Sequence, residues 1–175
     1  MTKAKQISLC SVMVALALAL SYTERFIPLQ LIIPLPGIKL GLANTVTLIA
    51  LFMFRTKYAF WVLIPRCILG AVFGGGITGL LFSLSGGLLA MLTMALARNC
   101  PLFSIYGVSV LGAAAHSIGQ ILSAMVLMHS VYVGGYLPYL LMVSVFTGLL
   151  IGSLCAGILR VLPKAFLSVP AEMSR

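Results

Sequence analysis

The chain has 175 residues, of which 62% are hydrophobic and 7% are charged, and its only acidic residues are Glu24 and Glu172. The net charge of +9 comes from basic residues dispersed between long apolar runs, without the clustered basic face of a nucleic-acid-binding protein. The composition therefore predicts an all-α integral membrane protein that lies in the lipid bilayer and has no nucleic-acid partner.

Apolar runs cover approximately residues 7–22, 40–54, 58–76, 77–97, 106–130 and 137–162. Since a helix needs about 20 residues to cross a bilayer, we predict a six-transmembrane-helix bundle that forms a single transmembrane domain over residues 1–175. The second run is short for a full crossing. The glycines at 70, 74, 75, 76 and 79 predict that the third and fourth runs meet in a broken or re-entrant turn.

Basic residues between the runs indicate how the chain is oriented. With the N-terminus inside, the two sides of the membrane receive unequal shares: Lys3, Lys5, Arg55, Lys57, Arg98, Arg160, Lys164 and Arg175 lie inside, and Arg25 and Lys39 lie outside. This asymmetry predicts a multi-pass protein of the bacterial cytoplasmic membrane with both termini in the cytoplasm. The first run also has the basic start and small residues of a secretory signal, but we expect it to be retained as a span.

Arg66 is a charged residue inside the third run. A charge near the centre of a membrane helix costs about 2.5–3.5 kcal/mol on insertion scales, so we expect the side chain to be paired or to line a cavity. Glu24 is the acidic partner that the sequence offers. Without that pairing, Arg66 binds an anionic ligand group or is a structural residue bonded to backbone carbonyls.

Other polar residues recur inside the runs or at their ends. Asn44 and Thr47 share a helical face at the start of the second run, and His116 and Gln120 share a face of the fifth. Such side chains face protein or a cavity, where they bind a ligand or join two helices. Our candidate substrate-binding residues are Lys39, Asn44, Arg66, His116 and Gln120. The two cations among them favour an anionic ligand group.

Two outer segments have alternative interpretations. The apolar, proline-containing segment 26–39 cannot form a regular helix, and it is either a lid over the outer mouth or an interfacial connector. An aromatic group near the outer ends of the fifth and sixth runs is either an interfacial belt or a mouth for a planar or isoprenoid-like ligand; its members are His129, Tyr132, Tyr136 and Tyr139.

Small residues repeat at four-residue spacing in the first run, where Ser11, Ala15 and Ala19 lie on one face. Such a face either packs inside the bundle or docks a separate subunit. We expect internal packing for the same pattern elsewhere, in Gly70/Gly74, Gly75/Gly79, Ala115/Gly119 and Gly148/Gly152/Ala156.

The sequence has no nucleophile-base-acid arrangement, no phosphate-binding glycine loop and no CxxC pair. We therefore expect no catalytic residues, no metal site, no cofactor and no enzyme activity of its own. Any active transport would draw its energy from a partner.

Several of these features resemble one family. The short six-span chain, the small residues from Ala15 to Ala19 and the segment PLPGIKLGLANTVTL at 34–48 resemble bacterial proteins described either as Gx transporters or as heptaprenyl diphosphate synthase component I. That family is in turn similar to the substrate-binding S components of energy-coupling-factor (ECF) transporters. The resemblance implies a transmembrane coupling subunit docked on Ala15 and Ala19, ATPase subunits as further partners, and a ligand beneath an outer lid at 26–37.

The two descriptions imply different functions. The first is a membrane-embedded substrate-capture subunit of a small-molecule transporter, energised by separate subunits. The alternative is a non-catalytic membrane accessory subunit of heptaprenyl diphosphate synthase, because prenyl elongation uses Mg²⁺ held by aspartates and this chain has none. A structural assembly protein without a ligand is a third possibility.

Overall fold

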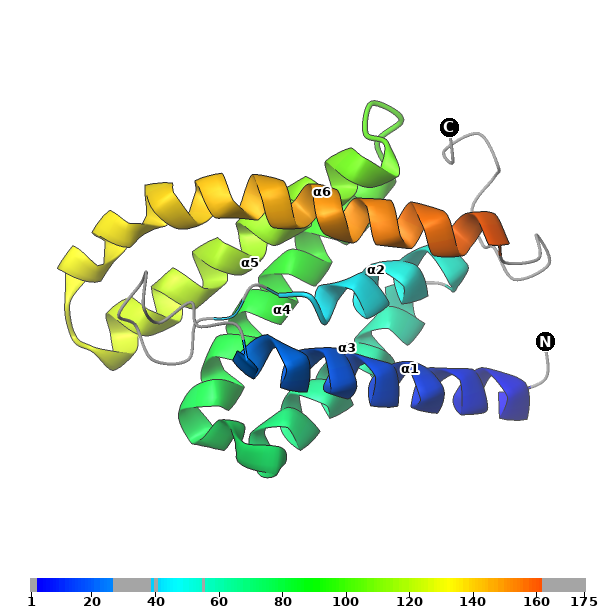
Figure 1. Ribbon diagram of the computed structural model, residues 1–175, viewed down its shortest axis with the longest axis horizontal. Helices are drawn as coiled ribbons and strands as arrows, with labels where there is room; N and C mark the ends of the chain where they lie inside the picture. Colours follow the sequence, from blue (N-terminus) through cyan, green and yellow to red (C-terminus); the bar gives the residue numbers. More distant parts are fainter. Residues whose placement is uncertain (1–2, 27–38, 40, 55, 162–175) are drawn as a thin grey trace.

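The computed structural model describes residues 3–26, 39, 41–54 and 56–161. Nearly all of these residues are helical, which confirms the all-α prediction for this part of the chain (Figure 1). The α-helices are α1 (Lys3–Thr23), α2 (Asn44–Met53), α3 (Thr56–Gly70), α4 (Gly76–Arg98), α5 (Ile105–Leu127) and α6 (Leu137–Val161). Shorter elements are the 3-10 helices η1 (Glu24–Phe26) and η4 (Val131–Tyr136) and the π-helical turn η3 (Ala71–Gly75).

Within the described residues, four helical stretches are long and apolar enough to cross a membrane: Gln6–Thr23, Thr56–Arg98, Ile105–Leu127 and Val131–Val161. The second of these contains α3, η3 and α4, which correspond to the third and fourth apolar runs. These stretches identify the chain as a membrane protein. The number of full crossings stays a prediction.

The break expected between the third and fourth runs lies in η3. Phe73 and Gly74 have non-helical backbone angles there, and Gly74 has a φ of +110°, a conformation that glycine adopts without steric cost. This turn lets α4 fold back against α3 (Figure 1).

One end of the bundle gathers the start of α1, the end of α2, the start of α3 and the end of α4. Tyr58 donates a 2.9 Å hydrogen bond to Gln6, and Arg98 donates to the carbonyls of Leu51 and Phe54. The end of α6 lies at this end as well (Figure 1). Lys57 and Arg98 are thus at the end that the distribution of basic residues assigns to the cytoplasm; the side of the membrane itself stays a prediction.

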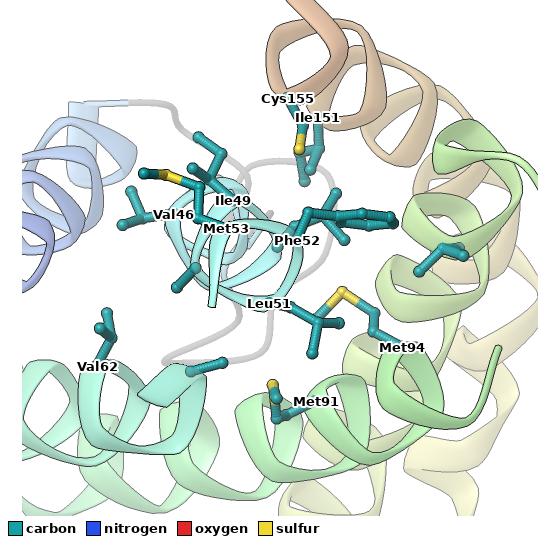
Figure 2. Packing of buried hydrophobic residues seen from close by; sticks show 14 of the residues in the cluster. Val46, Ile49, Leu51, Phe52, Met53, Val62, Met91, Met94, Ile151 and Cys155 are labelled. Atoms are coloured by element: carbon teal, nitrogen blue, oxygen red, sulfur yellow. The ribbon is translucent and has the colours of Figure 1, made fainter. Parts of the chain in front are cut away.

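Helix α2 forms the centre of the fold. All ten of its residues are buried, and around it lie Val62 of α3, Met91 and Met94 of α4, and Ile151 and Cys155 of α6 (Figure 2). Ten residues extend about 15 Å, half of the roughly 30 Å hydrocarbon core. The second run is therefore no full span in its helical part, which corrects the expectation of a helix over 40–54.

Charged residues from other elements lie at the two ends of α2. The capping position is Ala43, whose side chain cannot accept a hydrogen bond, and instead Glu24 of η1 accepts from the Ala43 N–H at 3.3 Å. At the other end Arg98 donates to the carbonyls of Leu51 and Phe54. A carboxylate at the N-terminus and a guanidinium at the C-terminus both match the helix dipole, so they stabilise a short helix that could not persist alone.

The small-residue pattern marks close packing in the later helices. A Cβ at Gly119 would lie 2.7 Å from the Ser85 carbonyl oxygen, and one at Gly148 would lie 2.6 Å from Val110 Cα. These distances confirm the expected internal packing of α5 against α4 and α6. Gly79 is buried as well, but a Cβ there would meet nothing within 4 Å, so no close helix contact requires a glycine at this position.

Candidate functional site

Arg66 and Asn44 meet in the interior of the bundle. Arg66 is 6% exposed and Asn44 is 4% exposed, and Nη2 of the arginine donates a 2.7 Å hydrogen bond to Oδ1 of the asparagine. Arg66 Nε and Asn44 Nδ2 are buried donors without an acceptor in the described chain, and the hydroxyls of Thr45 and Thr47 are buried and unpaired as well. Buried donors left unpaired cost about 1–3 kcal/mol each, so this position suits an additional acceptor group.

His116, Gln120 and Lys39 form a second set of contacts. In the amide orientation that satisfies its neighbours, Gln120 donates to the Lys39 carbonyl at 3.1 Å. Its side-chain oxygen accepts from the Lys39 N–H at 3.1 Å and from His116 Nε2 at 3.2 Å. Gln120 of α5 thus holds the backbone of Lys39, and His116 on the same helical face donates to Gln120.

Serine side chains extend this set toward α4. Lys39 Nζ donates to Ser83 Oγ at 3.2 Å, and Ser123 of α5 donates to Ser85 of α4 at 2.7 Å. These serines were not predictable as site residues, because isolated serines are common at helix contacts in membranes and their spacing gives no further indication of a site.

Three glycines make room for the polar side chains. A Cβ at Gly86 would lie 2.7 Å from His116 Nδ1, and one at Gly87 would lie 3.4 Å from Arg66 Nη2. Gly41 has a φ of +82°, and a Cβ there would lie 3.0 Å from His116 Cδ2 and 3.1 Å from Asn44 Nδ2. Since this single position lies so close to both His116 and Asn44, the Arg66–Asn44 pair and the His116–Gln120 pair are neighbours and form one polar cluster. We define the polar cluster as Lys39, Asn44, Arg66, His116 and Gln120, the five residues selected from the sequence.

Glu24 is 5% exposed beside this cluster. Arg66 donates to Asn44 and not to Glu24, so the direct Arg66–Glu24 ion pair considered from the sequence is not formed. Burial raises the pKa of the Glu24 carboxyl, and the charges of Arg66 and Lys39 oppose that shift. The carboxylate is therefore close enough to feel both cations while its hydrogen bond goes to the start of α2.

The structure describes only part of the two outer segments. Residues 27–38 and 40, which include most of the expected lid, lie outside the described residues. Tyr132 is 93% exposed, and Tyr136 and Tyr139 are also exposed. Their exposure favours the interfacial belt over an aromatic mouth.

The small-residue face of α1 points away from the bundle. Met13 and Ala17 of α1 are buried in the core, whereas Ser11, Ala15 and Ala19 are exposed. Beside this face runs an apolar groove of about 810 Å³ between α1 and α3, whose lining includes Ser11 and Ala15 and, from α3, Tyr58, Trp61 and Pro65. The face is therefore open to another molecule, and the internal-packing interpretation does not hold for it.

A family model of heptaprenyl diphosphate synthase component I matches residues 13–158. The chain belongs to the component I family. The matched region contains Glu24 and the whole polar cluster, from Lys39 to Gln120, so the site lies within the part that component I proteins share. No protein of curated function matches the chain, and no solved structure does.

Proposed function

We propose that this chain is a non-catalytic membrane subunit of a prenyl diphosphate synthase, which binds a diphosphate-bearing isoprenoid while a separate subunit elongates the chain. The observation that carries the proposal is the buried guanidinium of Arg66, whose Nε has no acceptor, in a chain of the component I family. A guanidinium offers parallel N–H groups that fit the oxygens of a phosphate. Since the chain contains no aspartate, the Mg²⁺-dependent step is assigned to the partner.

The composition of the polar cluster supports an anionic ligand. Arg66 and Lys39 supply positive charge, and Asn44 supplies an unused N–H donor. These groups are at least partly removed from water, where charge interactions are much stronger than at a surface. A site of this kind inside an apolar bundle suits a molecule with a charged head and an apolar tail.

A second candidate function is substrate capture for a small-molecule transporter of the ECF type, energised by a coupling subunit and ATPase subunits. The exposed face of Ser11, Ala15 and Ala19 favours it, because small residues let a helix of another membrane subunit approach closely. The polar cluster would then bind a water-soluble anion.

Purification from native bacterial membranes in a mild detergent tests both functions. Mass spectrometry of the proteins and small molecules that co-purify should find a prenyltransferase subunit and a diphosphate-bearing isoprenoid. A membrane coupling subunit with ATPases and a water-soluble anion would support the second function instead. If neither set of proteins is found, and if Arg66→Ala removes no anionic molecule from the preparation, both proposals are wrong.

A further inference from the structure

The carboxylate of Glu24 lies at the start of α2. Its Oε1 accepts from the Ala43 N–H at 3.3 Å, longer than the 2.7–2.9 Å usual when an N–H donates to a charged oxygen. Glu24 is nevertheless 95% removed from solvent, with 5% of its surface exposed. The backbone N–H groups of Leu42 and Ala43 both hydrogen-bond this carboxylate, so Glu24 occupies the positive end of α2 that an anionic ligand group would also occupy.

Unused donors lie at the same end of α2. Asn44 is the first residue of this helix, and its Nδ2 has no acceptor. Arg66 contacts the same asparagine through Nη2, and its Nε is also unpaired. Both side chains are more than nine-tenths buried, so these donors indicate a second acceptor group at the helix end in addition to Glu24.

We propose that Glu24 is an internal anion that competes with the ligand's anionic group for the positive end of α2 and thereby sets the affinity of the site. This inference rests on the proposed function and deepens it. The charged or titratable groups at the site are Arg66 and Lys39 as cations, Glu24 as the carboxylate, and His116. With His116 neutral, the formal charges of these described groups sum to +1.

A multiply charged group, such as a diphosphate, brings a surplus of negative charge next to Glu24. Two anions at one buried position repel strongly, because little solvent screens them. The ligand therefore binds with Glu24 displaced from Ala43 or neutralised by a proton. In either case the carboxylate weakens binding and favours release.

Calorimetric titration of inorganic diphosphate at pH 8 into the detergent-solubilised full chain tests this inference. Glu24→Gln keeps the length of the side chain and an oxygen that accepts from Ala43, but it removes the charge. The affinity of the variant for diphosphate should exceed that of the original chain at least about tenfold. Glu24→Ala should also bind more tightly, and ligand-free melting temperatures establish that each variant is folded.

Glu172→Gln is the matched control, because it changes the net charge by the same amount at the chain's other acidic residue. It should leave the affinity unchanged, and an equal gain in both variants would show a general charge effect and overturn the inference. Suppose that the original chain binds diphosphate, that Arg66→Ala abolishes this binding and that Glu24→Gln leaves the affinity unaltered. The inference is then wrong, while the proposed function stands. If neither the original chain nor Glu24→Gln binds diphosphate, both are wrong.

Discussion

Nη2 of Arg66 lies 2.7 Å from Oδ1 of Asn44, so a guanidinium is held at the first residue of a buried half-length helix. This position is electrostatically unfavourable by itself, because the N-terminus of a helix already carries a partial positive charge. In the described part of the chain, Glu24 is the only acidic residue available to offset it. The contact therefore gives a physical reason for an anionic ligand at this point.

The glycines of α4 allow the polar cluster to be disturbed without changing a charge. In Gly86→Ala the new Cβ would lie 2.7 Å from His116 Nδ1 and 3.0 Å from the His116 carbonyl oxygen, so α5 and its histidine must shift. We expect a loss of about 1–3 kcal/mol in the free energy of unfolding and weaker binding of diphosphate. Melting temperatures in detergent and a calorimetric titration measure the two effects.

Gly79→Ala is the control in the same helix, since its Cβ would meet nothing within 4 Å. It should be neutral or stabilising by up to about 1 kcal/mol, because alanine is the better helix former. Equal melting temperatures for the two variants would contradict the close approach of α4 and α5 at Gly86.

The exposed face of α1 predicts where a partner subunit docks. Replacing Ala15 and Ala19 by leucine fills this face without touching the core, so the isolated chain should melt as before while co-purification with the partner is lost. Quantitative mass spectrometry of the purified complex measures the loss. Ala17→Leu is the contrasting control. Ala17 is fully buried, so overpacking there should lower the melting temperature. Undiminished association of the double variant would exclude this face as the docking site.

The orientation can be tested with cysteines at opposite ends of the bundle. In a background without Cys10, Cys67, Cys100 and Cys155, a cysteine in place of Tyr132 should react with a membrane-impermeant maleimide in intact cells. A cysteine in place of Lys57 should react only after the membrane is permeabilised, because the distribution of basic residues places it in the cytoplasm. Labelling of both positions from one side would refute the predicted orientation.

The contacts of Arg98 predict that this charged residue has a structural role. Arg98→Met would leave the carbonyls of Leu51 and Phe54 without their shared donor, and we expect a loss of about 1.5–3 kcal/mol in stability. Arg160→Met removes an exposed arginine from the last turn of α6 and should change the melting temperature little. If both variants melt alike, Arg98 is not the cap of α2.

Much of the fold follows from local patterns. Apolar runs located the helices within a few residues, and the glycines around residue 74 located the turn between α3 and α4, because exclusion of charge and backbone sterics act locally. The length of α2 was not predictable in the same way. Its run begins at residue 40, but the left-handed conformation of Gly41 and the turn bonds from Asn44 to Gly41 delay the helix to Asn44.

The candidate site, too, could be predicted only in part from local patterns. The sequence indicates Arg66 as a lone charge, Asn44 together with Thr47, and His116 together with Gln120, because polar groups in apolar helices must find partners. Which partner each one finds depends on how distant elements pack. The pairing of Arg66 with Asn44 in place of Glu24, and the room that Gly86 gives to His116, are therefore visible only in the structure.

Calorimetric titration of inorganic diphosphate into the original chain, Arg66→Lys and Arg66→Ala tests the anion site most directly. We expect binding by the original chain, about tenfold weaker binding by Arg66→Lys, because an ammonium cannot reproduce the two-pronged contact of a guanidinium, and no binding by Arg66→Ala. Ligand-free melting temperatures accompany each titration. Equal affinity in all three proteins, with a large loss of melting temperature in Arg66→Ala, would show that Arg66 is a structural residue and would contradict the anion site.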